Sequence, residues 1–328
     1  MYSITSTKNI NEQFNPNRPE GKNFYLLYNT AENKQFEMAF LEVKEHDVLI
    51  CILPYFVMDF PLNTMLPNGL IKKSINWLKI KIVFVGHPSC DHGYIHGDVS
   101  LNLLKQVNSK LRSYASLICY KGFGTNLPLL DFTRVKGLPI AILNVSPTYW
   151  ETLKGTVRKN LRKRLTLTKN LKFLETNGLP LKYVDQVHSL YENTQNRSNT
   201  KFEFLHKNYF INTSSISKYL FYFDENEIIG FVQLLCSKES MSLKYGGMDY
   251  KKSLKYQVYF AMQLQGLNIC IRDGIKELDF GVTSYQFKNY MGALNYPLFN
   301  YFHHSNYLVN WLLKKISFIV EPSRDELK

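Results

Sequence analysis

The chain has 328 residues, a length typical of two domains, and its 45% hydrophobic and 14% aromatic content excludes a disordered protein. Lysine and arginine number 40 against 27 aspartates and glutamates, and this net charge of +13 favours polyanionic partners: nucleic acid, an anionic membrane face or a phosphate-bearing cofactor. Five cysteines stand singly without CxxC spacing, which argues against a disulfide framework or zinc ribbon and suits a reducing cytosol.

The chain carries no pattern that predicts export or a membrane span. Its N-terminal region has no apolar stretch of signal-peptide length. The most apolar run, residues 48–62, is short, contains Asp59 and is interrupted by Pro54 and Pro61. We therefore expect a cytoplasmic protein that is either soluble or peripheral on the inner face of the membrane.

Strand-forming residues dominate the start of the first half. Residues 24–29, 36–43 and 47–59 are rich in β-branched and aromatic side chains between polar turns, which predicts an antiparallel meander. Residues 68–80 then place apolar side chains on one helical face, with lysines around Trp77. This helix either packs on the core or lies on a membrane surface, as basic amphipathic helices do.

A polar loop follows the buried strand predicted at residues 82–85. The loop at 87–98 holds the densest set of potential metal ligands in the chain: His87, Cys90, Asp91, His92, His96 and Asp98. It has no recognised metal-binding spacing, and a loop rich in glycine, aspartate and histidine is commonly only a loop, so we expect no metal. A metal-dependent enzyme that uses this loop is kept as one alternative.

The first half ends with a helix at 101–114 and strands at 116–120 and 139–145. We place the boundary after residue 145, which gives domains 1–145 and 146–328. The second domain opens on a helix whose residues 154–169 carry seven basic side chains and no acidic one. One interpretation is a basic face exposed to solvent. The other is a face that binds an anionic partner, because like charges at neighbouring helical positions repel one another and cost stability. A non-enzymatic nucleic-acid-binding module built on this helix is the second alternative.

The rest of the second half alternates strands and helices. A strand at 171–176 and a helix at 184–197 precede a three-stranded meander at 219–223, 228–236 and 241–249, and Gly230 is a natural bulge position. A helix with apolar residues at helical spacing follows and ends at Gly274.

A strand at 277–281 completes a strand-helix-strand unit. Leu278 points to one face of this strand and Asp279 to the other, so a carboxylate enters a region usually covered by apolar residues. It is either a buried structural aspartate or part of a substrate site at the strand's C-terminal end. A strand at 298–303 follows. The last helix, 306–320, is apolar on almost all sides and either packs between the halves or docks on a partner or membrane.

Four motifs in this order carry a resemblance: KGTVRKNLRKR, the DENEIIGF turn, YGGMDY and DFGVTSYQFKNYMGA. Together they resemble the FemAB-like and CelD-like branch of the GNAT acyltransferase superfamily. The resemblance implies a mixed α/β fold with two GNAT-like halves, each a meander followed by a strand-helix-strand unit. It also implies an amide-forming acyltransferase that moves an acyl or aminoacyl group from a thioester or tRNA donor to an amine.

The donor is less defined by the resemblance, because the loop before the central helix reads KKSLKYQ and lacks the glycines of ordinary GNAT enzymes. Helix N-termini suit pyrophosphate binding. Here either lysines replace the backbone donors that hold acyl-CoA, or the donor is acyl carrier protein or aminoacyl-tRNA. No tightly bound cofactor is expected. The candidate cofactor-binding residues are Lys251, Lys252, Lys255, Arg158 and Arg162.

Amide formation needs a neutral amine, a donor for the developing oxyanion and a proton source for the leaving group. Asp249 and Asp279, at the ends of neighbouring strands, are candidates for binding or deprotonating the amine. Tyr285 is a candidate proton donor, and the resemblance favours Lys288 for neutralising a phosphate, carboxylate or oxyanion; an exposed helix face is the alternative for both. Candidate substrate-binding residues are Tyr245, Arg197, Asp91 and His92.

Three features predict attachment to an anionic membrane face: the net charge, the helix around Trp77, and the terminal helix with Trp311, Lys314 and Lys315. They suggest a lipid amine or a lipid-linked cell-envelope precursor as acceptor. Nucleic acid is expected as a partner only if the donor is tRNA.

Overall fold

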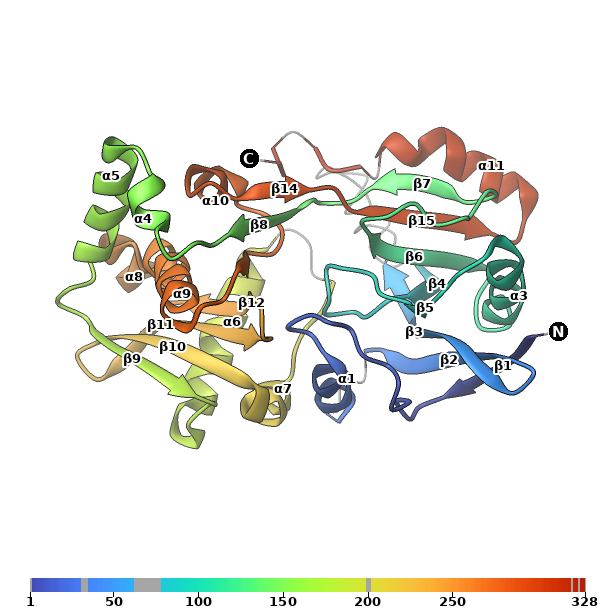
Figure 1. Ribbon diagram of the computed structural model, residues 1–328, viewed down its shortest axis with the longest axis horizontal. Coiled ribbons are helices and arrows are strands. Elements are labelled where there is room, and N and C mark those ends of the chain that lie inside the picture. The colour runs from blue at the N-terminus through green and yellow to red at the C-terminus, as the bar shows by residue number, and fades with distance from the viewer. Residues whose placement is uncertain are drawn as a thin grey trace. The chain divides into compact units, whose positions relative to one another are not determined.

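The computed structural model describes residues 2–30, 35–61, 78–198, 202–319, 321–323 and 325–327 (Figure 1). The chain forms two compact units. Unit 1 comprises Met1–Pro16, Lys34–Pro139 and Tyr296–Lys328, and unit 2 comprises Asn17–Asn33 and Ile140–Asn295. Each unit contains a mixed sheet with helices, so the predicted mixed α/β class is confirmed.

Unit 1 is built on a sheet in the order β1-β2-β3-β4-β6-β15-β7, with the short β5 (His96–Gly97) paired to β3. β4 and β6 are parallel and are connected through α3 (Leu101–Leu111), and the other strand pairs described in this sheet are antiparallel. Buried aliphatic side chains of α3 and the central strands form one core, including Leu53, Val83, Leu104, Val107 and Ile118. The strand bounds are β1 Tyr2–Thr7, β2 Glu37–Glu45, β3 Val48–Pro61, β4 Lys79–Val85, β6 Leu117–Phe123, β7 Thr133–Lys136 and β15 Phe299–His304.

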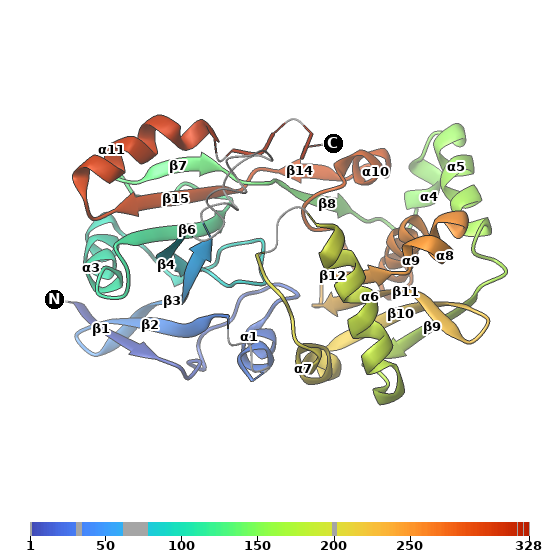
Figure 2. The same cartoon turned by 180° about the vertical axis from the view of Figure 1, so that it is seen from behind.

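Unit 2 is built on a sheet in the order β14-β8-β13-β12-β11-β10-β9. Helix α6 (Val184–Arg197) covers one face of this sheet and α9 (Val258–Asp273) the other, as the two opposite views show (Figures 1 and 2). A Cβ added to Gly247 would lie 2.4 Å from the Leu190 carbonyl carbon, so only glycine lets α6 approach β12 this closely. The strand bounds are β8 Ile140–Asn144, β9 Lys172–Asn177, β10 Ser217–Asp224, β11 Glu227–Cys236, β12 Ser240–Met248, β13 Glu277–Asp279 and β14 Leu294–Tyr296.

Shorter helices complete the two units. In unit 2 these are α1 Lys22–Asn29, α4 Tyr149–Thr152, α5 Gly155–Thr166, α7 Lys207–Asn212, α8 Tyr250–Tyr256 and α10 Tyr285–Tyr290, and in unit 1 there is α11 Tyr307–Ile316. Within the part of the chain that the structure describes, no helix is long and apolar enough to cross a membrane.

Two sequence-based expectations are corrected by the structure. Residues 24–29 form helix α1 rather than a strand, because Phe24, Tyr25 and Tyr28 fall on one helical face and are all buried. The division into 1–145 and 146–328 also differs from the observed units. β8 pairs with β13 in unit 2, and β15 lies between β6 and β7 in unit 1. The helix predicted around Trp77 lies outside the described residues.

Candidate active site

Strands β12 and β13 of unit 2 run parallel and then separate. They are paired only from Ser240 with Glu277 to Ser242 with Asp279, and β12 then continues to Met248. Among the described residues no strand pairs with residues 243–248 on that side. Ligands of open α/β sheets usually bind at the carboxyl ends of strands, where neighbouring strands separate. We call residues 243–248 the diverging part of β12, and this part is the first element of the candidate site.

The chain that leaves β13 makes a strained turn. Thr283 and Ser284 have φ of 70° and 52°, and Gly281 has φ of 68°. A β-branched residue such as Thr283 rarely adopts this left-handed conformation, and such strain is found mostly at functional sites. We call residues 280–284 the β13 turn.

Lys288 on α10 holds the β13 turn in place. Its side chain is buried, and Nζ donates to the carbonyl oxygens of Phe280, Gly281 and Val282 at 2.7, 3.2 and 3.1 Å. An ammonium group has three protons to donate, and these three carbonyl oxygens are acceptors that the turn presents to it. The alternative of an exposed helix face does not hold for Lys288, because this residue is 2% exposed.

Asp279 and Tyr285 flank the same turn. Asp279 Oδ1 accepts a hydrogen bond from Gly281 N at 2.7 Å. Tyr285, the first residue of α10, is buried, and Lys288 Nζ lies 5.8 Å from the centre of its ring. The structure thus brings together three of the four predicted catalytic residues.

Asp249 does not join them. Ser242 is the register partner of Asp279, and Asp249 lies seven residues farther along β12, which corresponds to roughly 20 Å. Its carboxylate caps helix α8 by accepting from Lys251 N at 2.8 Å and Lys252 N at 3.1 Å. The two aspartates therefore do not act on one amine as a pair.

A second group of polar side chains gathers at the diverging part of β12. Tyr245 donates from its hydroxyl to Glu203 Oε2 at 2.6 Å, and Tyr28 on α1 donates to Glu203 Oε1. The rings of Tyr191 and Tyr209 lie edge-on to Tyr245, at 5.9 and 5.4 Å between centroids. We call Tyr28, Glu203 and Tyr245 the Glu203 cluster.

Burial and a neighbouring charge keep the phenol of Tyr245 protonated. Burial, and then the charge of Glu203, raise the pKa of Tyr245 well above its ordinary value. Tyr245 is therefore a neutral hydrogen-bond donor at physiological pH. A carboxylate held by two phenols can accept a proton from a reacting group, and the phenols can return one.

The residue before Tyr245 makes a nearly buried ion pair. Lys244 Nζ lies 2.8 Å from Glu20 Oε1, and the two side chains are 6% and 13% exposed. The free-energy cost of removing two charges from water offsets most of their mutual attraction, so such a pair adds little to folding stability. Buried charges of this kind are found preferentially at functional sites. Arg18 lies two residues before Glu20, and its Nη1 atom is buried without a hydrogen-bond partner.

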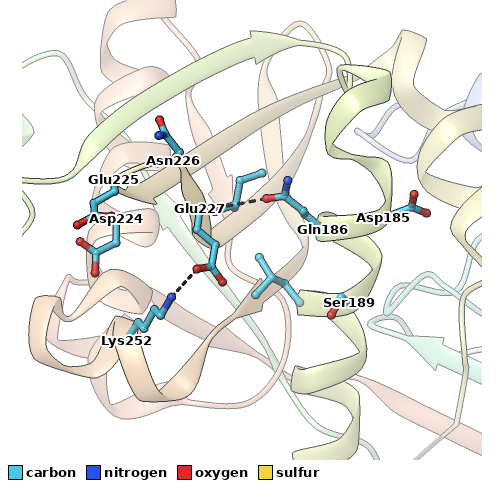
Figure 3. A pocket seen from close by; sticks show the side chains of 10 residues that line it. Asp185, Gln186, Ser189, Asp224, Glu225, Asn226, Glu227 and Lys252 are labelled. Atoms are coloured by element: carbon cyan, nitrogen blue, oxygen red, sulfur yellow. Dashed lines mark hydrogen bonds and ion pairs between the residues drawn. The ribbon is translucent and has the colours of Figure 1, made fainter.

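A cavity of about 720 Å³ opens beside α8 and the β10–β11 hairpin (Figure 3). Glu227 points toward Lys252 and forms an ion pair with it, whereas Asp185 points away on the far side of α6. Lys255 pairs with Asp224 at 3.8 Å. Two of the three predicted cofactor-binding lysines are thus neutralised by carboxylates, and Lys251 is exposed.

The predicted arginines contact aromatic side chains and the backbone of unit 2. Arg158 donates to the Trp150 carbonyl at 3.3 Å, and Arg162 lies 5.7 Å over the Trp150 ring. Arg197 stacks 4.2 Å over the ring of Tyr250. Helix α5 still exposes Lys154, Lys159, Arg162 and Lys163, and none of the ion pairs found among the described residues involves them.

Asp91 and His92 belong to unit 1 and cannot be assigned to the site described above. Within the described residues, which include all of 87–98, no three histidine, cysteine or carboxylate side chains gather in a metal-binding arrangement. The loop is instead held by Lys121, whose Nζ donates to the carbonyls of His87 and Pro88 at 3.3 and 3.4 Å and also to that of Cys90. The metal-dependent alternative is thus not supported.

Sequence reasoning missed Glu20, Glu203, Tyr28 and Lys244. Glu20 and Tyr28 lie more than 170 residues before their partners, so no local spacing relates them. A weak pattern was available at Lys244, where a charged residue interrupts the apolar alternation of a central strand.

The fold was then compared with known proteins. No family model and no curated protein matches the sequence. Among solved structures, FemX is similar at a TM-score of 0.60 and 10% identity, with 94% of this chain and 100% of that chain covered. A tandem GNAT protein from the clavulanic acid biosynthesis pathway is similar at a TM-score of 0.56 and 7% identity, covering 93% and 99%.

A third similar structure is the C-terminal domain of a putative lysylphosphatidylglycerol synthetase from Agrobacterium fabrum. Its TM-score is 0.54 at 12% identity, with 82% of this chain and 85% of that chain covered. These matches confirm the predicted two-part architecture. The chain has the fold of FemX and of the tandem GNAT protein, and the resemblance of its motifs to the FemAB-like branch is confirmed at the level of the fold.

Proposed function

We propose that the protein is an amide-forming N-acyltransferase whose reaction takes place at the diverging part of β12. The observation that carries the proposal is the separation of β12 from β13 after Ser242, with the Glu203 cluster on β12 beyond that point and the strained β13 turn at the end of β13. The likeness to FemX and to a tandem GNAT protein supports this class of reaction.

In the proposed reaction the acceptor amine attacks the donor's acyl carbon, and the thioester or ester bond breaks. Glu203 takes the proton that the nitrogen loses, directly or through Tyr245, and the leaving group receives a proton in turn. The Lys244–Glu20 pair orients β12, and Asp279 with Tyr285 shapes the β13 turn. Lys288 positions that turn without touching the reactants.

The donor does not use the N-terminus of α8 as a pyrophosphate cradle. The Asp249 carboxylate already accepts from the amides of Lys251 and Lys252, and a phosphate there would meet a like charge. Among the residues that the structure describes, no ion pair involves the exposed basic side chains of α5, and these side chains suit a polyanionic carrier. We therefore favour a donor carried by tRNA or acyl carrier protein over acyl-CoA in its usual pose.

The acceptor is an amine on a lipid or cell-envelope precursor. The name of one similar structure, a putative lysylphosphatidylglycerol synthetase, supports a lipid acceptor.

The test is a mass-spectrometric transfer assay that offers acyl-CoA, acyl carrier protein and aminoacyl-tRNA in parallel to amine acceptors. Glu203→Gln is expected to lower kcat by about 10²–10⁴, the usual contribution of a general base. Glu192→Gln, a part-exposed carboxylate on α6, is the matched control and should retain activity. Failure of every donor, or wild-type turnover by Glu203→Gln at unchanged melting temperature, would refute the proposal.

A further inference from the structure

Helix α11 of unit 1 presents large apolar side chains to solvent. Tyr307 and Leu308 are 78% and 71% exposed, Trp311 and Leu312 are 51% and 49% exposed, and Phe318 just beyond the helix is 71% exposed. No residue of α11 is buried. Single exposed apolar residues are ordinary, but five within twelve positions form an apolar patch of the kind that marks an interaction site.

Helix α11 contacts its unit through its least exposed residues and leaves a large apolar side facing outward. At about 100° per residue, Tyr307, Leu308, Trp311 and Leu312 fall on one side of the helix. Asn310 falls on the opposite side and contacts the unit, since its Oδ1 accepts from His304 N at 3.3 Å and its Nδ2 donates to the Asp131 carbonyl at 3.5 Å. The side toward unit 1 carries Asn310 and the partly buried Leu313, and the side with Tyr307, Leu308, Trp311 and Leu312 faces outward.

Positive charge accompanies this outward face. Lys315 lies on it, with Nζ 5.8 Å from the centre of the Trp311 ring, and Lys314 lies at its edge. Residues 306–319 contain no acidic residue. The nearest acids in sequence, Glu321, Asp325 and Glu326, follow the helix rather than lie on it.

We propose that α11 is an interfacial helix that docks unit 1 on an anionic lipid surface. Interfacial helices combine an apolar face, aromatic residues at the headgroup level and lysines that extend toward anionic headgroups, and α11 has all three. A second copy of the chain fits this face less well. A two-fold interface would bury Lys314 and Lys315 of both copies in one patch, with no acid on the helix to pair with them. This proposal does not depend on the acyl-transfer reaction.

The experiment is co-sedimentation of the full-length chain with vesicles of phosphatidylcholine alone or with phosphatidylglycerol added, at low and high salt. We expect binding to the anionic vesicles that weakens as salt rises. Lys314→Gln with Lys315→Gln should lower the partition coefficient roughly fivefold per lysine at low salt, from about 1 kcal/mol for each basic residue near an anionic surface. Leu308→Ser with Trp311→Ser should lower it at least tenfold.

Val48→Ser serves as the control, because Val48 is 65% exposed in unit 1 and lies on the β2–β3 hairpin. All variants change exposed side chains, so their melting temperatures should match the wild type. The proposal is overturned if the chain ignores anionic vesicles at low salt, or if Leu308→Ser with Trp311→Ser binds them as the wild type does. It is equally overturned if that double variant only dissociates a dimer in sedimentation equilibrium, which would assign the face to a second copy.

Discussion

Replacing Lys288 with methionine tests whether this residue is structural or catalytic. Methionine keeps the length and apolar stem of the side chain but removes the ammonium group that binds the carbonyls of Phe280, Gly281 and Val282. The Gly281 carbonyl also accepts from Ala141 N at 3.2 Å and keeps that partner. The Phe280 carbonyl is buried and loses its lysine donor, while the Val282 carbonyl is partly exposed and can bind water.

These contacts set the size of the effect. An unsatisfied buried carbonyl costs about 1–3 kcal/mol, and loss of the charged donor removes further stabilisation from the turn. Removing the ammonium group also removes its own desolvation cost, which offsets part of this loss. We expect Lys288→Met to lower the free energy of unfolding by about 2–3 kcal/mol, or roughly 4–12 °C in the melting temperature of a domain of this size.

Urea denaturation followed by far-UV circular dichroism measures the loss, and hydrogen exchange locates it. Lys251→Met is the control, because Lys251 is exposed on α8 and should change stability by less than about 0.5 kcal/mol. Lys121→Met should destabilise unit 1 in the same way, since Lys121 also donates to three loop carbonyls. A Lys288→Met variant of wild-type stability that has lost transfer would refute this reasoning and return Lys288 to the catalytic residues.

Two further predictions concern unit 2. Thr283→Gly should raise the free energy of unfolding by up to about 1 kcal/mol in thermal melts, because glycine adopts φ of 70° without strain. The same change at Thr166 in α5 should lower the free energy of unfolding by about that amount. Equal effects at both sites would contradict the assignment of strain to Thr283. The pKa of Asp273 is lowered to about 2, first by Arg272 and then by Lys218. The stabilisation that the ionised carboxylate gives to the fold is therefore complete above the ordinary pKa of 3.8 and is lost as pH falls toward 2. Asp273→Asn should therefore lower the free energy of unfolding by roughly 1 kcal/mol at neutral pH, after allowance for screening by water. The variant should also lose less stability than the wild type between about pH 4 and 2. A variant whose stability falls with acid as the wild type's does would contradict the ion-pair account.

Most of the elements could be predicted from local patterns. The helix predicted at 184–197 coincides with α6, and the meander before Asp249 is present as β10, β11 and β12. Gly274 ends α9 at φ of 70°, because glycine adopts the left-handed conformation of a helix C-terminus at low cost. These features depend on residues near one another in sequence, so periodicity and turn chemistry are sufficient to find them.

The expectations that failed depended on distant parts of the chain. Residues 24–29 are aromatic enough for a strand, and their helix is selected by packing against residues near position 209. The boundary after residue 145 was expected where the predicted strand at 139–145 ends. In the structure β15, from the end of the chain, pairs with both β6 and β7 and so joins unit 1. Pairing between strands so far apart in sequence leaves no local pattern.

The sequence by itself determined the mixed α/β class, the order of elements in the second half and the concentration of positive charge on α5, because each is a property of neighbouring residues. It also placed Asp279, Tyr285 and Lys288 together, since one short segment carries all three. Only the tertiary structure decided what they contact. The strand register separates Asp249 from Asp279, and the buried Lys288 donates hydrogen bonds to the β13 turn. The fold also brings Tyr28 to Glu203 across more than 170 residues. Side-chain roles at this site depend on which distant groups a fold brings into hydrogen-bonding range, and a linear pattern does not contain that information.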